Sequence, residues 1–404
     1  MTEVFNCFSG ASGLHSNTDK TDIVLNGVSP DIEEAILRHT GFKKGSLPFK
    51  YLGVRISHKR LSKIDCNVLV DKMLARIRDW NKKKISYSGR LILVKSVLET
   101  IHNYWSQIFF LPIGVMDRIK ALCRNFLWEG HESYTKAPLV AWSVLCQGKE
   151  YGGLGLTDTH MWNIAAIGKL VWWIAIKKDH LRIKWVDKIY IKDVPWIKYQ
   201  PTQYSSWAWR KICEVKEKFR DAYVQGKWLD TDDAYKISKG YEWLTHLTQQ
   251  KVVWAKVVWN MFNIPRHNFI LWLIQRLRLL TLDRLQKMGI ANSGVCFLCA
   301  RENESHHHLF HESSYAKLCY KQLSSRLQIQ LVGDISPGQM LLQRKFSGLQ
   351  RLVLSSLIVA VHYGIWHVRN VYRLDSYVMH PVTLIQQIKK ESRLRIMAVA
   401  HGPS

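Results

Sequence analysis

The chain has 404 residues, a formal net charge of +26 at pH 7 and a hydrophobic fraction of 47%. This length allows two or three domains with sizeable hydrophobic cores. The positive surplus indicates a polyanionic partner, and nucleic acid fits best because phosphate contacts dominate non-specific affinity. A membrane surface, or a basic soluble protein without such a partner, are the alternatives.

The sequence lacks the features of a secreted or membrane-spanning protein. Its eight cysteines show no disulfide-like spacing, and the start, Met1–Cys7, has neither the basic residues nor the apolar run of a signal peptide. One apolar window, Leu352–Val361, is too short to cross a bilayer of about 30 Å and predicts a buried helix. We therefore expect an intracellular protein, nuclear or cytoplasmic, with no membrane partner.

Residues 1–58 combine turns with short apolar runs. The segment Phe49–Ile56 alternates enough to predict a strand or hairpin. Residues 31–39 predict one short helix, with Ser29 or Asp31 as its N-cap.

Residues 59–130 predict an antiparallel helical bundle. Apolar residues recur at helical spacing from Asp65 to Trp80. A second helix is expected to begin at Ser86 or Ser88 and to end before Pro112. A third helix follows and ends near Trp128, and the short connections favour antiparallel neighbours.

The rest of the chain divides into segments of different character. The glycine-rich stretch Gly148–Gly155 lacks a phosphate-loop register and favours a turn. A nearly wholly apolar helix is expected over Trp162–Ile176. Residues 179–232 are tryptophan-rich and charged and predict an irregular linker. A compact module is expected over residues 235–325, followed by a helical tail at 345–395.

A metal-binding pattern stands within that module. Cys296 and Cys299 are two residues apart, so both thiolates can point into one small volume. The histidines of the segment His306–His311 follow after a short polar gap and can supply a third ligand. In a reducing compartment this pattern indicates metal before disulfide, and it suits tetrahedral zinc.

The chain resembles the stretch downstream of the catalytic aspartates in plant non-LTR (LINE-type) retrotransposon reverse transcriptases. The similar residues follow the same order along the chain. They are Phe8–Leu14, Leu47–Val54, Ser86–Leu91, Lys95–Leu98, Tyr104–Trp105, Phe126–Trp128 and Gly152–Leu156. The resemblance implies the end of a polymerase palm over residues 1–58 and a helical thumb after it.

A second stretch is similar to the zinc-binding module that follows the polymerase in those elements. The matching residues are Tyr241–Leu244, Trp254, Trp259, Ile264–Pro265, Phe269–Leu273, Leu279, Thr281, Arg284–Leu285, Gly289–Ile290, Cys296, Cys299 and His308–Phe310. Residues Tyr363–Trp366 with Arg369–Asn370 resemble the helix that commonly follows the module.

The zinc pattern departs from the family at one position. The resemblance implies Cys296, Cys299 and His308 as ligands and a fourth ligand, cysteine, where this chain has Ser313. His311, three residues after His308, can replace it if one helical turn brings both imidazoles together; His306, His307 and Cys319 are further alternatives. Because structural zinc sites are almost always four-coordinate, we expect zinc to be bound weakly or not at all.

The resemblance also implies that catalytic residues are absent. Polymerases of this type hold magnesium with paired aspartates between β-rich flanks, and in the family that pair precedes the stretch matched here. The adjacent pair Asp232–Asp233 lies in a polar segment without such flanks. We therefore expect a truncated, non-catalytic fragment that needs no magnesium. A fragment of an intact RNA-directed DNA polymerase, with its gene start misplaced, is the alternative.

The basic thumb region supports nucleic-acid binding. Residues 59–130 hold 14 Lys and Arg against 6 Asp and Glu. The candidate contact residues are Lys82, Lys83, Lys84, Arg90 and Lys95. Such charges grip the phosphate backbone without reading sequence, although a solvated basic face has the same composition.

Together these observations predict a mainly α fold with a small N-terminal α/β remnant. The expected segments are a palm remnant (1–58), a helical thumb and connection (59–178), an irregular linker (179–234), a zinc-binding-like module (235–325) and a helical tail (326–404). The expected function is non-specific binding of RNA or DNA. A domesticated protein-interaction module is the alternative from another class.

Overall fold

A computed structural model gives the architecture. It describes residues 2–14, 17, 21–25, 27–51, 53–57, 59–133, 137–192, 194–225, 234–246, 250–328 and 346–401. Most of this part of the chain is helical, and its strands form two small two-stranded sheets. The expected mainly α fold is therefore confirmed.

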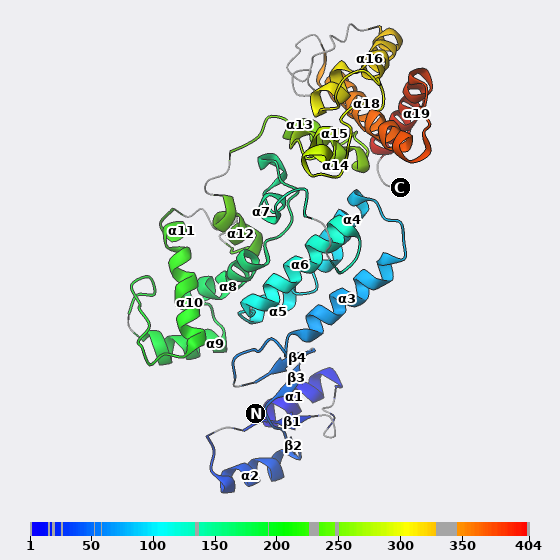
Figure 1. Cartoon of the computed structure of the whole chain (residues 1–404). Helices are drawn as coiled ribbons and strands as arrows, with labels where there is room; N and C mark the ends of the chain where they lie inside the picture. The colour runs from blue at the N-terminus through cyan, green and yellow to red at the C-terminus, as the bar shows by residue number, and fades with distance from the viewer. Residues whose placement is uncertain are drawn as a thin grey trace.

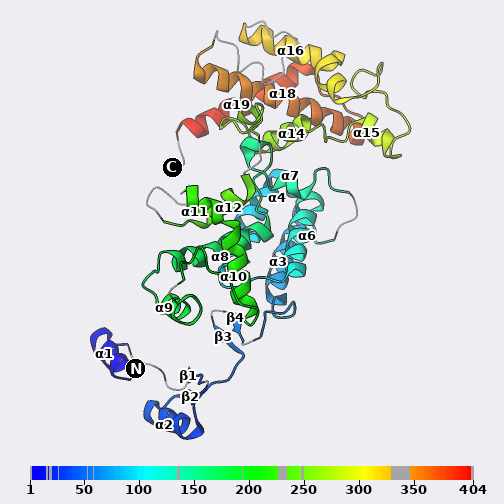
Figure 2. The same cartoon turned by 90° about the vertical axis from the view of Figure 1, so that its left-hand side faces the viewer.

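The N-terminal elements form a small α/β unit at one end of an elongated molecule (Figures 1 and 2). The expected hairpin is present as an antiparallel pair, and the expected short helix begins at Pro30 after Ser29. Among the described hydrophobic residues of this unit, Val54 alone is buried, so the unit has little hydrophobic core of its own. The elements are α1 (Thr2–Ser12), β1 (Asp22–Ile23), α2 (Pro30–Thr40), β2 (Lys43–Lys44), β3 (Phe49–Tyr51) and β4 (Val54–Ile56).

The helical bundle follows as expected, with one difference. Its second helix is divided by a π-helix, after which Glu99 lies buried. Ser86 is the N-cap and accepts from the Gly89 N–H, whereas Ser88 donates to the Pro265 carbonyl in a distant helix. The elements are α3 (Asn67–Asn81), α4 (Tyr87–Leu93), η1 (Val94–Leu98), α5 (Asn103–Ile108) and α6 (Ile113–Glu129).

The apolar helix expected over residues 162–176 is α8 (Thr159–Ala175), which is covered by neighbouring helices. Asp158 caps it by accepting from the His160 and Met161 N–H groups. Helix α12 (Ile237–His246) packs along α8, and its Tyr241 hydroxyl accepts from the Asp158 N–H over 2.9 Å. Two short elements precede α8, namely α7 (Trp142–Leu145) and the 3-10 turn η2 (Lys149–Tyr151).

The expectation of an irregular linker over residues 179–234 is wrong for the residues described there. They form α9 (Leu181–Val186), η3 (Asp187–Ile191), α10 (Trp207–Lys218) and α11 (Arg220–Gln225). Trp209 lies at the centre of an aromatic cluster: its ring stacks on Tyr190 at 4.6 Å and its indole N–H donates to the Tyr199 hydroxyl. Trp209 is part of the hydrophobic core of this segment and Trp196 packs against it.

The C-terminal helices form a lobe at the other end of the molecule (Figure 1). The tail helices pack directly on the helices of the expected zinc module, and one continuous hydrophobic core joins them to the bundle. The elements are α13 (Ala255–Val258), α14 (Pro265–Gln275), α15 (Leu282–Lys287), η4 (His308–Glu312), α16 (Ser314–Leu327), α18 (Gly348–Asp375) and α19 (Pro381–Ala400).

Helix α18 contains the apolar window discussed above. By length and composition it could cross a membrane, and 61% of its apolar window is buried inside the fold. Core helices of soluble proteins pass the same test, so this helix is weak evidence for a membrane span.

Candidate metal centre and basic surface

The candidate metal centre lies in the loop between α15 and α16. Cys296 and Cys299 stand in a tight turn, in which the Ala300 N–H donates to the Cys296 carbonyl and the Cys296 N–H donates to the Glu302 carbonyl, each over 2.8 Å. The donor atoms of Cys296, Cys299 and His308 all lie within 4.8 Å of one another. The structure thus brings together three of the four predicted ligands.

The ring of His308 is buried and has a different neighbour at each nitrogen. Its Nε2 lies 3.2 Å from the Cys299 Sγ. Its Nδ1 lies 3.1 Å from a carboxylate oxygen of Glu302 and 3.8 Å from one of Glu312, without hydrogen-bond alignment to either. A metal-bound histidine commonly turns its second nitrogen toward a carboxylate. The arrangement therefore fits a ligand that binds metal through Nε2.

The two thiols differ in their electrostatic surroundings. Burial raises the pKa of Cys296 to about 11. Burial also opposes ionisation of Cys299, but the backbone N–H groups of Glu302 and Arg301 and the His308 ring together hold the pKa of this thiol below its usual value. Metal ions bind cysteine as thiolate, so Cys299 is the thiol better prepared for a metal.

His311 does not join this group in the described part of the chain. Its ring instead lies 5.4 Å from that of His307 and 5.6 Å from that of His362, centroid to centroid. The π-helix η4 explains the difference, because its wider turn changes the direction of His311 relative to His308 from that expected in a regular helix. A different residue or water must therefore complete a tetrahedral site.

The remaining alternatives have other partners. Ser313 is fully buried; its hydroxyl donates to the Leu309 carbonyl and accepts from the Ala316 N–H, so it caps α16. His306 Nδ1 lies 3.3 Å from the Thr281 hydroxyl, and His307 lies 3.1 Å from Glu312. Cys319 is buried in α16 beside Tyr315. None of these stands within the three-ligand group described above.

A buried ion pair, which sequence reasoning missed, holds the metal loop in place. Arg369 of α18 donates to both carboxylate oxygens of Glu304 over 2.7–3.2 Å, and both side chains are almost fully buried. Glu304 also accepts from the Leu282 N–H at the start of α15, and Arg369 donates to the Leu280 carbonyl. Arg369 is among the residues that resemble the helix commonly following the zinc-binding module of the family. That resemblance was the sequence signal that could have drawn attention to Arg369.

Two cysteines and a histidine on a tight loop form a donor set typical of a structural zinc site. The loop is held by its own turn and by a buried ion pair within the same chain. The fold and the donor set together define this region as a candidate zinc-binding module.

Comparison with known proteins agrees with that assignment. Residues 235–319 match the family described as zinc-binding in reverse transcriptase. The chain is also 30% identical over 156 residues to a putative ribonuclease H protein of Arabidopsis thaliana. This match covers 38% of the chain and 25% of that protein, so the chain spans only about a quarter of its relative. Both findings confirm the resemblance to retrotransposon reverse transcriptases, and they make zinc plausible at Cys296, Cys299 and His308.

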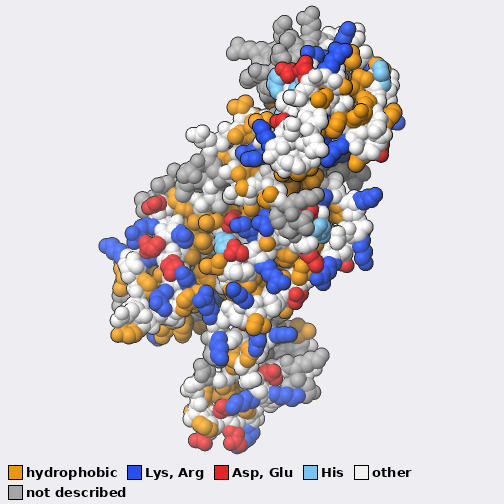
Figure 3. Space-filling view, viewed as in Figure 1, with side chains coloured by type: hydrophobic (Ala, Val, Ile, Leu, Met, Phe, Trp, Pro, Cys, Tyr) orange, Lys and Arg blue, Asp and Glu red, His pale blue; other side chains and the backbone are white. Residues whose placement is uncertain are grey.

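The predicted nucleic-acid contacts fall into two groups. Lys82, Lys83 and Lys84 are exposed in the loop between α3 and α4, and none of them pairs with a carboxylate in the described residues. Lys83 and Lys84 line a hollow of about 430 Å³ beside this loop. On the face of the molecule that Figure 3 shows, Lys and Arg side chains are spread out rather than gathered in one patch.

Arg90 and Lys95 are half-buried, and both donate to backbone carbonyls; Arg90 also lines the same hollow as Lys83 and Lys84. Their contact with nucleic acid stays a prediction. Arg90 donates to the carbonyls of Ile85 and Leu127, each over 3.1 Å, and burial lowers the pKa of its guanidinium. Lys95 donates to the Leu154 carbonyl over 2.5 Å. Half-buried cations gain from such acceptors, and a helical pattern alone does not reveal which cations have them.

The glycine-rich loop is a turn, as expected, with a second role in packing. The carbonyl of Gly152 accepts from the Trp272 indole and from the Arg276 guanidinium of α14. A Cβ on Gly153 would lie 2.1 Å from the Gln147 carbonyl oxygen, which only glycine avoids. The loop therefore joins the bundle to the zinc module.

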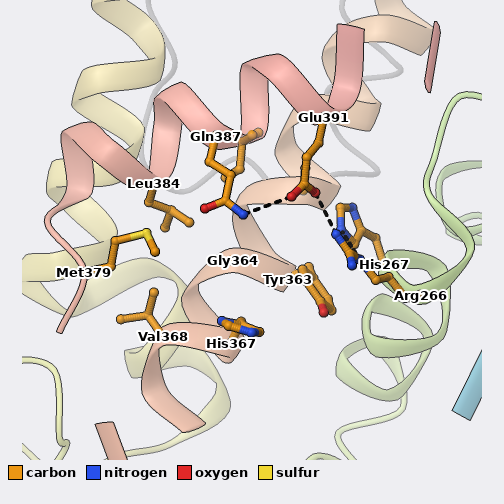
Figure 4. A pocket seen from close by; sticks show the side chains of 12 residues that line it. Arg266, His267, Tyr363, Gly364, His367, Val368, Met379, Leu384, Gln387 and Glu391 are labelled. Carbon is orange, nitrogen blue, oxygen red and sulfur yellow. Dashed lines mark hydrogen bonds and ion pairs between the residues drawn. The ribbon is translucent and has the colours of Figure 1, made fainter. Parts of the chain in front are cut away.

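A cavity of about 160 Å³ lies between α14, α18 and α19 (Figure 4). At its polar end Glu391 accepts from Arg266 over 2.8 Å and from Gln387 over 2.9 Å. The ring of His267 stacks on that of Tyr363 at 4.2 Å, and burial lowers the pKa of His267 to about 4. These contacts connect the three helices, so the lining of this cavity stabilises the C-terminal lobe.

Proposed function

We propose that this chain is a retrotransposon-derived protein of the LINE type that binds RNA or DNA inside the cell without sequence preference. The observation that carries the proposal is the exposed cluster Lys82–Lys84, which pairs with no carboxylate among the described residues, on a chain with a net charge of +26. The loop joins α3 and α4 of the bundle, so its three charges lie next to one another on the surface. Phosphate contacts of this kind give affinity without base readout.

The zinc-type loop has a structural role in this proposal. Cys296, Cys299 and His308 would hold the ion, which would tie the cysteine turn to η4 and couple metal binding to folding. Because a serine stands where the family has its fourth ligand, binding is proposed to be weak. Polymerisation is not part of the proposed function, since the adjacent pair Asp232–Asp233, which lies outside the described residues, has no β-rich flanks in the sequence.

Salt dependence tests nucleic-acid binding. Affinity for a labelled RNA or DNA duplex, measured by fluorescence anisotropy, is expected to fall steeply as salt rises, because bound phosphates release counterions. Replacing Lys82, Lys83 and Lys84 by alanine should reduce the slope of log affinity against log salt by up to about 3. An exposed triple control on α19, Lys389→Ala, Lys390→Ala and Arg393→Ala, removes the same charge elsewhere. A slope that changes equally in both variants would contradict a specific role for the loop.

A further inference from the structure

A groove of about 580 Å³ opens between α5, α8, α9, α10 and the segment that joins β4 to α3. Its volume lies within the range of about 300–1,000 Å³ typical of ligand sites. Apolar side chains of α8 form part of its lining, and the segment once expected to be a linker supplies one wall. The groove is therefore a product of the tertiary structure, and that wall lies far along the chain from the Lys82–Lys84 loop.

Aromatic rings line this groove. Trp185 is 54% exposed and meets Tyr190 edge to face at 5.7 Å. Trp207 is half-buried, with Phe110 edge-on at 5.8 Å. Contact between apolar indole surface and water is unfavourable, and a planar group that stacks on the indole removes this contact. Trp185 offers such a surface.

Positive charges accompany the rings. Four lining residues are cationic (Arg55, Lys59, Arg60 and Arg182), and one, Asp65, is anionic and pairs with Arg55 over 3.1 Å. The Arg60 guanidinium lies 4.1 Å from the Trp207 ring centroid, so charge and aromatic surface are adjacent. In the described part of the chain no carboxylate pairs with Lys59, Arg60 or Arg182.

A ligand that fits must carry both flat rings and negative charge along one extended chain. We propose that the groove binds single-stranded RNA or DNA, with a base stacked on Trp185 and phosphates beside Lys59, Arg60 and Arg182. In a duplex the base faces are already stacked, whereas a single strand can present them to an aromatic side chain. The inference rests on the proposed function, because it assumes a nucleic-acid ligand, and it adds a second surface that distinguishes single strands from duplexes.

The test compares two ligands on the full-length chain. Fluorescence anisotropy is measured with labelled oligo(dT) of about 15 nucleotides, within the range of known single-strand site sizes, and with a duplex of the same length. Trp185→Ala should weaken oligo(dT) binding roughly tenfold, as expected for loss of one stacked base, and should leave duplex binding unchanged. Trp185→Phe should retain most of the affinity and shows that the site still folds.

Two further variants separate stacking from charge. Tyr204 is 89% exposed and does not line the groove, so Tyr204→Ala is the matched aromatic control and should change neither affinity. Lys59→Gln with Arg182→Gln should reduce the oligo(dT) salt slope by about 1.4 if both touch phosphate.

The outcomes are distinguishable from those of the proposed function. Unchanged oligo(dT) affinity in Trp185→Ala, with the Lys82–Lys84 effect on duplex present, would overturn the groove and leave the proposed function standing. Failure of the unmodified chain to bind either nucleic acid would overturn both. The chain could also bind polyglutamate or phosphatidylserine vesicles more tightly than oligo(dT), in a manner that depends on Trp185. That result would overturn the proposal and identify an acidic protein or a membrane surface as the ligand of the groove.

Discussion

At the scale of single residues, Ser313 decides how a metal ion can be held. It follows His308 by five positions, and its N–H donates to the His308 carbonyl over 2.8 Å. Its hydroxyl already has two hydrogen-bond partners and caps α16. A hydroxyl is not ionised near neutral pH, so Ser313 stabilises the fold rather than supplying the missing thiolate.

Replacing this serine by cysteine should strengthen zinc binding. Ser313→Cys adds a thiolate at the position where the related family has one, at a cost of about 1 kcal/mol from the lost helix cap in the metal-free protein. Zinc retained after dialysis, measured by mass spectrometry, should rise in this variant. Ser313→Ala loses the cap without gaining a ligand and is the control. Tight binding of one zinc by the unmodified chain would show that a different fourth ligand is in use.

Glu99 gives the fold a predictable pH dependence. Burial raises the pKa of its carboxyl from the ordinary value of 4.5 to about 7, although hydrogen bonds from Thr157 and the charge of Lys95 oppose the shift. The folded protein therefore holds a proton between pH 4.5 and about 7 that the unfolded chain has lost. The contribution of Glu99 to the free energy of unfolding therefore falls as pH rises through this interval and levels off above it. Burial lowers the pKa of His102, His267 and His362 to about 4, so these three histidines contribute in the opposite direction.

Glu99→Gln should remove this contribution, which is about 3 kcal/mol at most. Urea denaturation over the interval should show that the free energy of unfolding of Glu99→Gln, relative to that of the unmodified chain, rises with pH. Glu214 is exposed, so Glu214→Gln should keep the original dependence. Parallel curves for Glu99→Gln and the unmodified chain would show that the pKa of Glu99 is not raised in the folded protein.

At the scale of elements, the glycine-rich loop and α14 depend on each other. The Gly152 carbonyl accepts hydrogen bonds from Trp272, which is fully buried, and from Arg276. These contacts require the loop backbone to pass close to the Gln147 carbonyl, where a side chain at Gly153 has no space.

Gly153→Ala should therefore destabilise the protein by about 2 kcal/mol or more, because a Cβ would clash with backbone that cannot move independently. Chemical denaturation followed by tryptophan fluorescence measures the change. A Cβ added at Gly348, the first position of α18, would meet no atom within 4 Å, so Gly348→Ala is a control expected to be neutral or slightly stabilising. Equal stability of the two variants would refute the close packing of this loop.

At the scale of the whole molecule, one hydrophobic core extends from the bundle to the C-terminal helices. The long helix α18 takes part in this core and also supplies Arg369 to the metal loop. The thumb-like bundle and the zinc-type module therefore share one hydrophobic core, and a nucleic acid bound at the Lys82–Lys84 loop would contact a bundle that packs against that module.

Polymerase activity is also a question for the whole molecule. We expect no template-directed synthesis, because a pair of aspartates on β-rich flanks is needed to hold magnesium at the primer end. Primer extension on a homopolymer template, with magnesium or manganese, measures it. Incorporation that survives Asp232→Ala with Asp233→Ala would contradict our account of the missing active site.

Sequence patterns predicted the features that depend on neighbouring residues. Helical spacing located the bundle, and Ser86 was one of its two candidate caps. The Cys-x-x-Cys spacing located Cys296 and Cys299, and the family resemblance implied His308, which the fold brings beside them. The predictions of helices and caps succeeded because turns and helical periodicity are set by local backbone geometry.

The sequence by itself therefore determined the helical class, the three-ligand group and the basic character of the chain. Only the tertiary structure decided that Arg90 and Lys95 donate to distant backbone carbonyls, that His311 leaves the metal group, and that residues once expected to be a linker form one wall of an aromatic groove. The physical reason is that burial and side-chain direction depend on which distant elements pack together. Local spacing specifies a helix face, but the partner that covers it comes from elsewhere in the chain.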